Sequence, residues 1–335
     1  MASIHRRMAT TLTAFTLVTV ATIVLAPTIG STRISLARAF DRSIPWADNV
    51  DAQIFFIARL PRVLAGALVG STLAAAGVVL QALLRNPLAT PFTLGVSASA
   101  ALGAMLAIAM NIDASAFGIA AVPVASFAGS LIGTGLVYFL ATRVGTTGIS
   151  TNVLLLAGVT LNTFFSALIT FVQYLVDFAD WYRTARWLLG NLDVSGYGPI
   201  LAALPLILLS FALFALLPRT LNLLTLGDDL AAGRGVDVAQ AQRIAFLSSS
   251  LATGAAISMA GPIGFIGIVV PHLVRLLVGA DHRIVLPAAT LFGAAFLVLC
   301  DLIARTIMAP VELPVGIVTA MIGGPFFLWL LVRKG

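Results

Sequence analysis

The sequence predicts an all-α polytopic membrane protein that crosses the bilayer ten times. Of its 335 residues, 60% are hydrophobic and only 10% are charged, and the mean hydropathy is +1.06. A soluble domain of this size carries more charge. Ten segments approach the roughly 20 apolar residues that cross a bilayer, and no polar block between them could fold alone. We therefore expect residues 1–335 to form one integral membrane domain.

The first expected span, at residues 9–27, follows a short basic N-terminus that contains Arg6 and Arg7. The apolar run is longer than the core of a typical signal peptide. A possible small-residue cleavage site at 37–39 lies well past its end, so we expect a retained helix. By the positive-inside rule, the basic flank places the N-terminus in the cytoplasm.

The other nine spans are apolar runs that end at charges or at turn residues. They are expected at about 61–84, 91–110, 122–140, 153–174, 199–217, 244–260, 265–278, 284–303 and 314–332. In the second span, Gly66, Gly70 and Gly77 share one small-residue face, and Gly129 and Gly133 form such a face in the fourth. Faces of this kind let two membrane helices approach closely.

Two connections have distinctive compositions. Residues 175–198 contain Trp181, Tyr182 and Trp187 among charged residues, which predicts an interfacial helix outside the membrane. The Gly-Pro-Ile-Gly run at 261–264 breaks the helix between the seventh and eighth spans. Broken backbone at membrane depth is tolerated where protein buries it or water lines it.

The distribution of charge supports this layout, with both termini in the cytoplasm. The net charge is +6, and Lys334 is the single lysine. The side with the termini receives eleven of the nineteen cations and four acids, as the positive-inside rule requires. Such a balance suits acidic lipid and acidic protein surfaces, and in a chain this apolar it does not indicate nucleic-acid binding.

Residues 218–243 form the longest polar interruption of the C-terminal half. Leucines recur there at helical spacing, and glycines punctuate the stretch, which predicts two short helices joined by glycine turns. Their apolar stripe must be buried against the chain itself or against another protein. The alternative is an amphipathic loop on the lipid surface.

Three arginines are expected at one outer membrane level. Arg59 and Arg62 flank the start of the second span, and Arg305 ends the ninth. If exposed, they could bind carboxylates of a docking partner through bidentate hydrogen bonds. The alternatives are contact with lipid phosphate, or a local pair of Arg305 with Asp301 at i and i+4.

Several activities lack the residues they need. The middles of the spans contain no Asp or Glu, which disfavours a proton relay or sodium site. The sequence has no phosphate-binding GxxxxGK[ST] loop and no GxSxG, HExxH or HxxEH motif. His272 has no second ligand in its neighbourhood, and Cys300 is the single cysteine. We therefore expect no catalytic residues and no metal site.

Several stretches share their order and spacing with one known family. They are Arg-Leu-Pro-Arg at 59–62, Gln-Ala-Leu-Leu-Arg-Asn-Pro-Leu-Ala at 81–89 with Leu-Gly-Val-Ser at 94–97, Leu-Leu-Leu-Ala-Gly-Val at 154–159, Gly-Phe-Ile-Gly at 264–267 with Val-Pro-His at 270–272, and Glu-Leu-Pro-Val-Gly at 312–316 with Gly-Gly-Pro at 323–325. From about residue 50 onward, the chain resembles the FecCD family. These are permeases of bacterial ABC importers for iron-siderophore complexes, haem and vitamin B12.

The resemblance implies a vitamin B12 importer-like (type II) permease in the bacterial inner membrane. Two such chains, identical or closely homologous, form a dimer with the substrate path at their interface. Two ATP-binding subunits lie in the cytoplasm, and one substrate-binding protein docks from the periplasm. This chain binds no cofactor of its own, because ATP and magnesium belong to the partner ATPase.

The resemblance also assigns residues to three roles. The positions that receive acidic residues of the binding protein are Arg59, Arg62 and Arg305. The coupling helices that seat on the ATPase contain Leu221, Leu224, Leu226, Gly227, Asp228, Asp229, Leu230, Gly233 and Gly235. The cytoplasmic gate contains Asn86, Leu88, Thr151 and Asn152.

The expected function is thus ATP-driven import of an intact iron(III)-siderophore complex from periplasm to cytoplasm. A haem or cobalamin permease of the same family is the first alternative. An ion-coupled secondary transporter is the second, and it would show uptake without any ATPase subunit.

Overall fold

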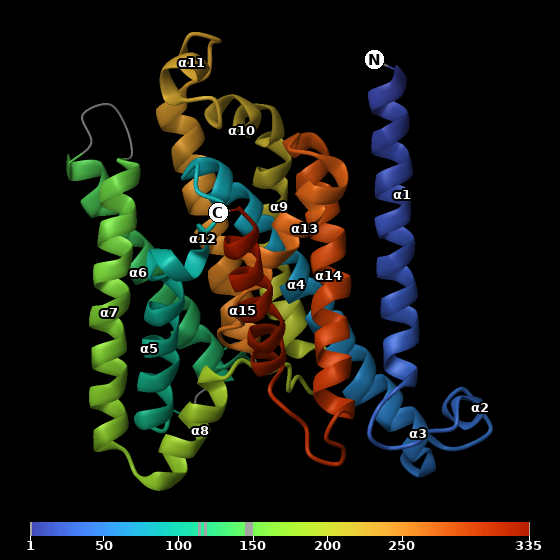
Figure 1. Cartoon of the computed structure of the whole chain (residues 1–335). Coiled ribbons are helices and arrows are strands. Elements are labelled where there is room, and N and C mark those ends of the chain that lie inside the picture. The colour runs from blue at the N-terminus through green and yellow to red at the C-terminus, as the bar shows by residue number, and fades with distance from the viewer. Residues whose placement is uncertain (1, 113–114, 117–118, 145–149, 335) are drawn as a thin grey trace.

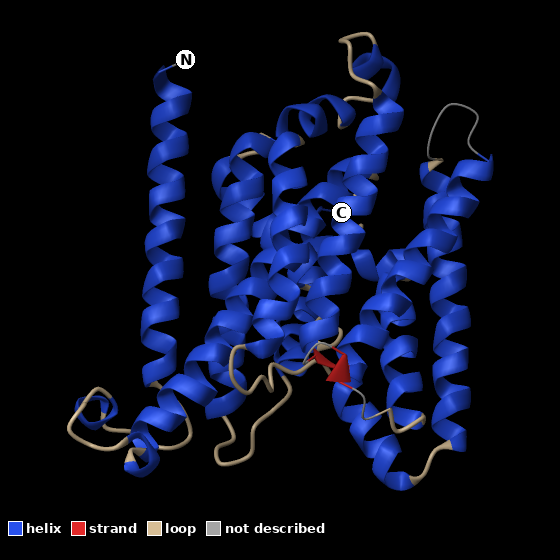
Figure 2. Cartoon of the chain, turned by 180° about the vertical axis from the view of Figure 1, so that it is seen from behind, coloured by secondary structure: helices blue, strands red, loops and turns tan. Residues whose placement is uncertain are grey.

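The computed structural model describes residues 2–112, 115–116, 119–144 and 150–334 (Figure 1). Helices dominate this part of the chain, as Figure 2 shows. The described strands are β1 (Ser115–Ala116) and β2 (Ile119–Ala120), which pair antiparallel.

Each expected span coincides with a helix, which confirms the predicted all-α fold. The helices are α1 (Ala2–Leu25), α4 (Leu60–Leu83), α5 (Val96–Ala109), α6 (Ala121–Val144), α7 (Thr151–Leu175), α9 (Gly198–Leu216), α12 (Val238–Ala260), α13 (Ile266–Val278), α14 (His282–Thr306) and α15 (Val315–Lys334). Within the described residues, six helices are long and apolar enough to cross a membrane, and α5, α13 and part of α15 are shorter apolar helices.

Two of the helix starts that differ from the expected positions have clear local reasons. The α12 helix begins at Val238 rather than at 244, because the Asp237 side chain accepts a hydrogen bond from the Gln240 N–H and caps the first turn. The third span contains the short 3-10 turn η4 (Pro91–Leu94) before α5. Gly95, at φ +75°, separates the two.

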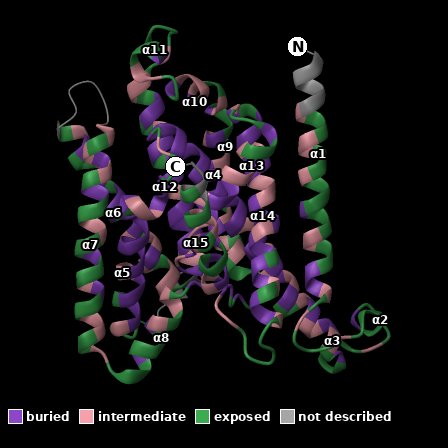
Figure 3. Cartoon of the chain, viewed as in Figure 1, coloured by how far each residue is buried: buried purple, intermediate pink, exposed green. Residues whose placement is uncertain are grey.

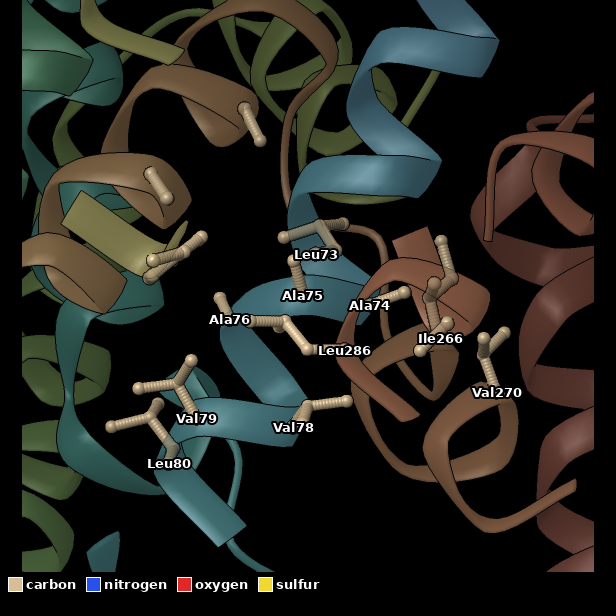
Figure 4. Close-up of a cluster of buried hydrophobic side chains, with 14 of the residues drawn as sticks. Leu73, Ala74, Ala75, Ala76, Val78, Val79, Leu80, Ile266, Val270 and Leu286 are labelled. Carbon is tan, nitrogen blue, oxygen red and sulfur yellow. The ribbon is translucent and has the colours of Figure 1, made fainter. Parts of the chain in front are cut away.

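Helix α4 lies at the centre of the bundle. In the apolar 18-residue stretch of this helix that could cross a membrane, 89% of residues are buried. The corresponding share for α1 is 6%, and the contrast is visible in Figure 3. Apolar side chains of α4 gather with Ile266 and Val270 of α13 and Leu286 of α14 (Figure 4). The predicted small-residue face provides the close approach, because a β-carbon at Gly70 would lie 2.2 Å from the Gly293 oxygen of α14.

The two ends of the bundle carry different short elements (Figure 1). At the α11 end lie α10 (Pro218–Leu224), α11 (Asp228–Ala232) and the start of α1. At the opposite α8 end lie α2 (Leu36–Ala39), α3 (Val50–Gln53) and α8 (Phe178–Leu188), with the short helices η1 (Ala26–Thr28), η2 (Trp46–Asp48) and η3 (Ile54–Arg59). The helix α8 confirms the helix expected within 175–198, and Asp177 caps it.

Candidate functional site

The segment 218–243 forms two short helices, as its leucine spacing predicts. Helices α10 and α11 are separated by Gly227, whose φ of +118° strongly favours glycine. A second turn follows α11, where Gly235 has φ +83°. The glycines therefore set the directions of the two helices, as expected.

The leucines of this segment divide into an inner and an outer group. Leu221 and Leu224 are buried in the protein's own core, at 0% and 2% exposure. Leu226 and Leu230 are exposed, at 54% and 58%. The two buried leucines hold α10 against the bundle, so a partner that binds here would contact the outer pair, together with the exposed residues Asp229, Gly233 and Gly235.

Polar contacts fix this segment to two turns of the bundle. Asp228 forms a 2.5 Å ion pair with Arg85, which follows α4. Asn222 donates to the Asp281 carboxylate at 2.8 Å and accepts from the His282 N–H at 2.9 Å. Hydrogen bonds from Arg283 hold the pKa of Asp281 well below its usual range, so this carboxylate is charged at neutral pH.

The residues predicted to form the gate lie on two separate elements. The Asn86 side chain accepts from the Leu88 N–H at 2.9 Å and closes a turn, with Leu88 41% exposed. Thr151 and Asn152 begin α7, which Ser150 caps. Across the described ranges, no hydrogen bond or ion pair joins the two groups, and residues 145–149 before α7 lie outside them. The gate role stays a prediction.

An open cavity lies between the Arg85 turn and the α13–α14 turn. Its empty space, which includes solvent at the open side, is about 670 Å³. It is lined by Gln81, Ala82, Arg85, Asn86, Pro87, Thr225, Arg275, Ala280 and His282. The sequence did not reveal this cavity, because its lining comes from segments nearly 200 residues apart.

Charged side chains also cluster at the α8 end. Arg62 donates to both carboxylate oxygens of Asp301, at 2.9 and 3.2 Å, and bonds Glu312 at 2.5 Å. Arg305 lies 3.6 Å from the same Asp301. The expected i, i+4 pair is therefore present. The link from Asp301 and Glu312 to Arg62 spans more than 230 residues, and no local pattern indicates it.

The three predicted docking arginines are not exposed, which corrects the expectation. Arg59 is 6% and Arg305 3% exposed, and the Arg62 side chain is 12% exposed. Arg59 donates to the Pro27 oxygen at 3.3 Å and to the Thr32 oxygen. Arg305 donates to the Ala26 oxygen at 2.9 Å. The segment 26–32 therefore covers two of the arginines, and their docking role stays a prediction.

In the described ranges, no group of three or more His, Cys, Asp or Glu side chains could hold a metal ion. The His272 ring packs edge-on against Phe326, with ring centroids 6.1 Å apart, and Cys300 is buried.

The fold and these two ends define a multi-pass membrane protein. The model of the FecCD transport family matches residues 17–333. The chain is 40% identical over 302 residues to the uncharacterized ABC transporter permease protein YvrB of Bacillus subtilis, covering 90% of this chain and 85% of the relative. It is 42% identical to the hemin transport system permease protein HmuU of Yersinia pestis, covering 82% of each.

A solved structure shows the same architecture. It is an inward-facing conformation of a protein provisionally classed as a metal-chelate type ABC transporter, with a TM-score of 0.83 and 35% identity over 96% of this chain and 98% of the other. The chain belongs to the FecCD family. It is the permease component of an ABC importer, and the ATPase activity resides in a separate subunit. Membership of this family argues against the alternative of an ion-coupled secondary transporter.

Proposed function

We propose that this chain imports an intact iron(III)-siderophore complex across the bacterial inner membrane. The observation that carries the proposal is the FecCD match over residues 17–333. It is supported by relatives named for iron(3+)-hydroxamate and Fe(3+)-citrate import, at 35% and 36% identity. The chain performs no chemistry on its cargo, and it binds no cofactor, since ATP and magnesium belong to the partner ATPase.

Haem or cobalamin is the second candidate cargo. The relatives named for hemin and cobalamin transport share 42% and 44% identity with this chain, more than the relatives named for iron(3+)-hydroxamate and Fe(3+)-citrate. All four cargoes are bulky metal chelates, so they need the same wide path but different linings.

In the proposed mechanism, two copies of this chain face each other and the cargo passes between them. The α11 end faces the cytoplasm, where two ATPase subunits contact Leu226 and Leu230. ATP closes the ATPase pair, the coupling segment moves, and the dimer switches between outward and inward openings. Asn86, Leu88, Thr151 and Asn152 close the cytoplasmic side.

The substrate-binding protein docks at the α8 end in this proposal. Carboxylates of the binding protein would replace the carbonyl oxygens of segment 26–32 on Arg59 and Arg305, and Glu312 on Arg62. Such an exchange keeps each guanidinium satisfied, and a carboxylate in place of a carbonyl oxygen would turn the hydrogen bonds of Arg59 and Arg305 into ion pairs. Docking thus requires segment 26–32 to move away from the two covered arginines.

The test is uptake by proteoliposomes that hold this chain with its ATPase and binding protein. A ferric siderophore, haem and cobalamin are offered in parallel, with and without ATP. We expect ATP-dependent accumulation of the ferric siderophore. Accumulation of haem or cobalamin alone would reassign the cargo, and uptake that persists with a hydrolysis-deficient ATPase would contradict the importer mechanism.

A further inference from the structure

Arg85 adopts a backbone conformation that is uncommon for a residue with a side chain. Its φ is +47°. The Arg85 N–H donates to the Ala82 oxygen at 3.3 Å, and the Asn86 N–H donates to the Gln81 oxygen at 3.1 Å. These are the two bonds of a Schellman motif, in which this position is usually glycine. The backbone at the end of α4 would therefore favour glycine over arginine.

The Arg85 side chain crosses to the coupling segment. Its guanidinium lies 2.5 Å from Asp228, the first residue of α11. The Gln242 side chain of α12 donates to the other carboxylate oxygen at 3.4 Å. Among the described residues, this is the ion pair that joins segment 218–243 to the turn after α4. The next residue in that turn is Asn86, the first predicted gate residue.

The stability of the fold does not account for this pair. The two side chains are 39% and 43% exposed, and exposed ion pairs contribute little to stability. Unfavourable backbone conformations persist where function requires them. The open cavity beside the pair is lined by Asn86 and Thr225, so the turn is not closely packed on that side.

We infer that the Arg85–Asp228 ion pair transmits movement of the ATPase-bound coupling segment to the gate turn at 85–88. The inference rests on the proposed function, because it requires an ATPase that moves α11. Arg85 is a positioning residue in this role, because its guanidinium acts through Asp228. The second link, from Asn222 to Asp281 and His282, anchors α10 and does not reach the gate turn.

The test compares three variants of the pair with one control. Arg85→Gly removes the side chain and relieves the backbone, and Asp228→Asn removes the negative charge at nearly constant volume. The double variant Arg85→Asp with Asp228→Arg exchanges the charges, and aspartate tolerates the left-handed conformation. The control is Arg143→Gln, at an exposed arginine of the same end that stacks on the Phe139 ring at 4.9 Å.

The primary measurement is cargo accumulated per ATP hydrolysed in proteoliposomes of the complete transporter. We expect each single variant to lower this ratio about three- to fivefold, the effect of an exposed ion pair. The double variant should recover most of the lost cargo-to-ATP ratio, and Arg143→Gln should show the wild-type ratio. Arg85→Gly should melt no lower than the wild type, which would separate coupling from folding.

A second measurement does not depend on the cargo. Maleimide labelling of Leu88→Cys, in a Cys300→Ala background, reports whether ATP with vanadate changes access to the gate turn. We expect that change to shrink in Arg85→Gly and Asp228→Asn. Wild-type ratios and labelling in both single variants, or losses that the charge exchange does not recover, would overturn the inference. Absence of cargo uptake by the wild type would instead count against the proposed function.

Discussion

At the scale of single residues, Asp301 holds two guanidinium groups within the protein. It is 2% exposed and contacts both Arg62 and Arg305. Removal of one partner from a buried pair leaves an uncompensated charge, which costs about 3–5 kcal/mol. We expect Asp301→Asn to lower the free energy of unfolding by that amount, measured from tryptophan fluorescence of the detergent-solubilised protein.

Glu312 provides the matched control, because it pairs with the same Arg62 but its side chain is 43% exposed. Exposed pairs contribute at most about 1 kcal/mol, so Glu312→Gln should change stability little. Equal losses in the two variants would show that Asp301 is not the central partner. Charge reversal at Arg59, Arg62 and Arg305 would test docking only if the variant is shown to be folded, because the buried Asp301 pairs with Arg62 and Arg305.

Gly70 offers a residue-scale prediction in the membrane core. A β-carbon there would lie 2.2 Å from the Gly293 oxygen, whereas a β-carbon at Gly135 of α6 meets nothing within 4 Å. Gly70→Ala should therefore destabilise by about 1–3 kcal/mol, as overpacking does. Gly135→Ala should stabilise by up to about 1 kcal/mol through helix propensity. Opposite shifts in melting temperature are the expected outcome, and two shifts of the same sign would contradict it.

Residue-level contacts were only partly predictable from the sequence. The small face of α4 and the Asp301–Arg305 pair follow from helical periodicity, which is local. The burial of Arg59 by the backbone of 26–32, and the pairing of Arg62 with Glu312, depend on how distant segments fold together. No local sequence pattern indicates either contact.

At the scale of elements, the leucines of segment 218–243 divide into buried ones that stabilise the fold and exposed ones that a partner could contact. Leu224 is 2% exposed and Leu226 is 54% exposed. We expect Leu226→Arg to change the free energy of unfolding by no more than the roughly ±0.5 kcal/mol of ordinary surface changes, while less ATPase copurifies. Leu224→Arg should destabilise the fold itself, because it buries an unpaired charge.

The comparison has a clear contrary outcome. If Leu226→Arg retains the ATPase fully, the outer leucines do not form the coupling surface.

The sequence was most informative about the elements, because glycine turns and apolar runs are local signals. The α12 start was missed because a cap residue, Asp237, outweighed the polar composition of the first turn.

At the scale of the whole molecule, α4 is the central one of the ten helices that match the expected spans in the described part of the chain, and the charges differ between the two ends. The cations placed at the α11 end in the sequence layout are Arg6, Arg7, Arg85, Arg143, Arg219, Arg234, Arg243, Arg275, Arg283, Arg333 and Lys334, against the acids Asp228, Asp229, Asp237 and Asp281. Apolar runs predicted the number of helices. Their mutual arrangement depends on long-range packing, and the family resemblance supplied it.

This charge asymmetry predicts which end faces the cytoplasm. Short loops rich in arginine stay on the cytoplasmic side, so the α11 end should be inside and the α8 end outside. Two exposed alanines allow a matched test in a Cys300→Ala background: Ala232 ends α11, and Ala47 lies in η2. In intact spheroplasts, a membrane-impermeant maleimide should label Ala47→Cys at once and Ala232→Cys only after permeabilisation. The reverse pattern would invert the topology, and it would place Leu226 and Leu230 where no cytoplasmic ATPase could reach them.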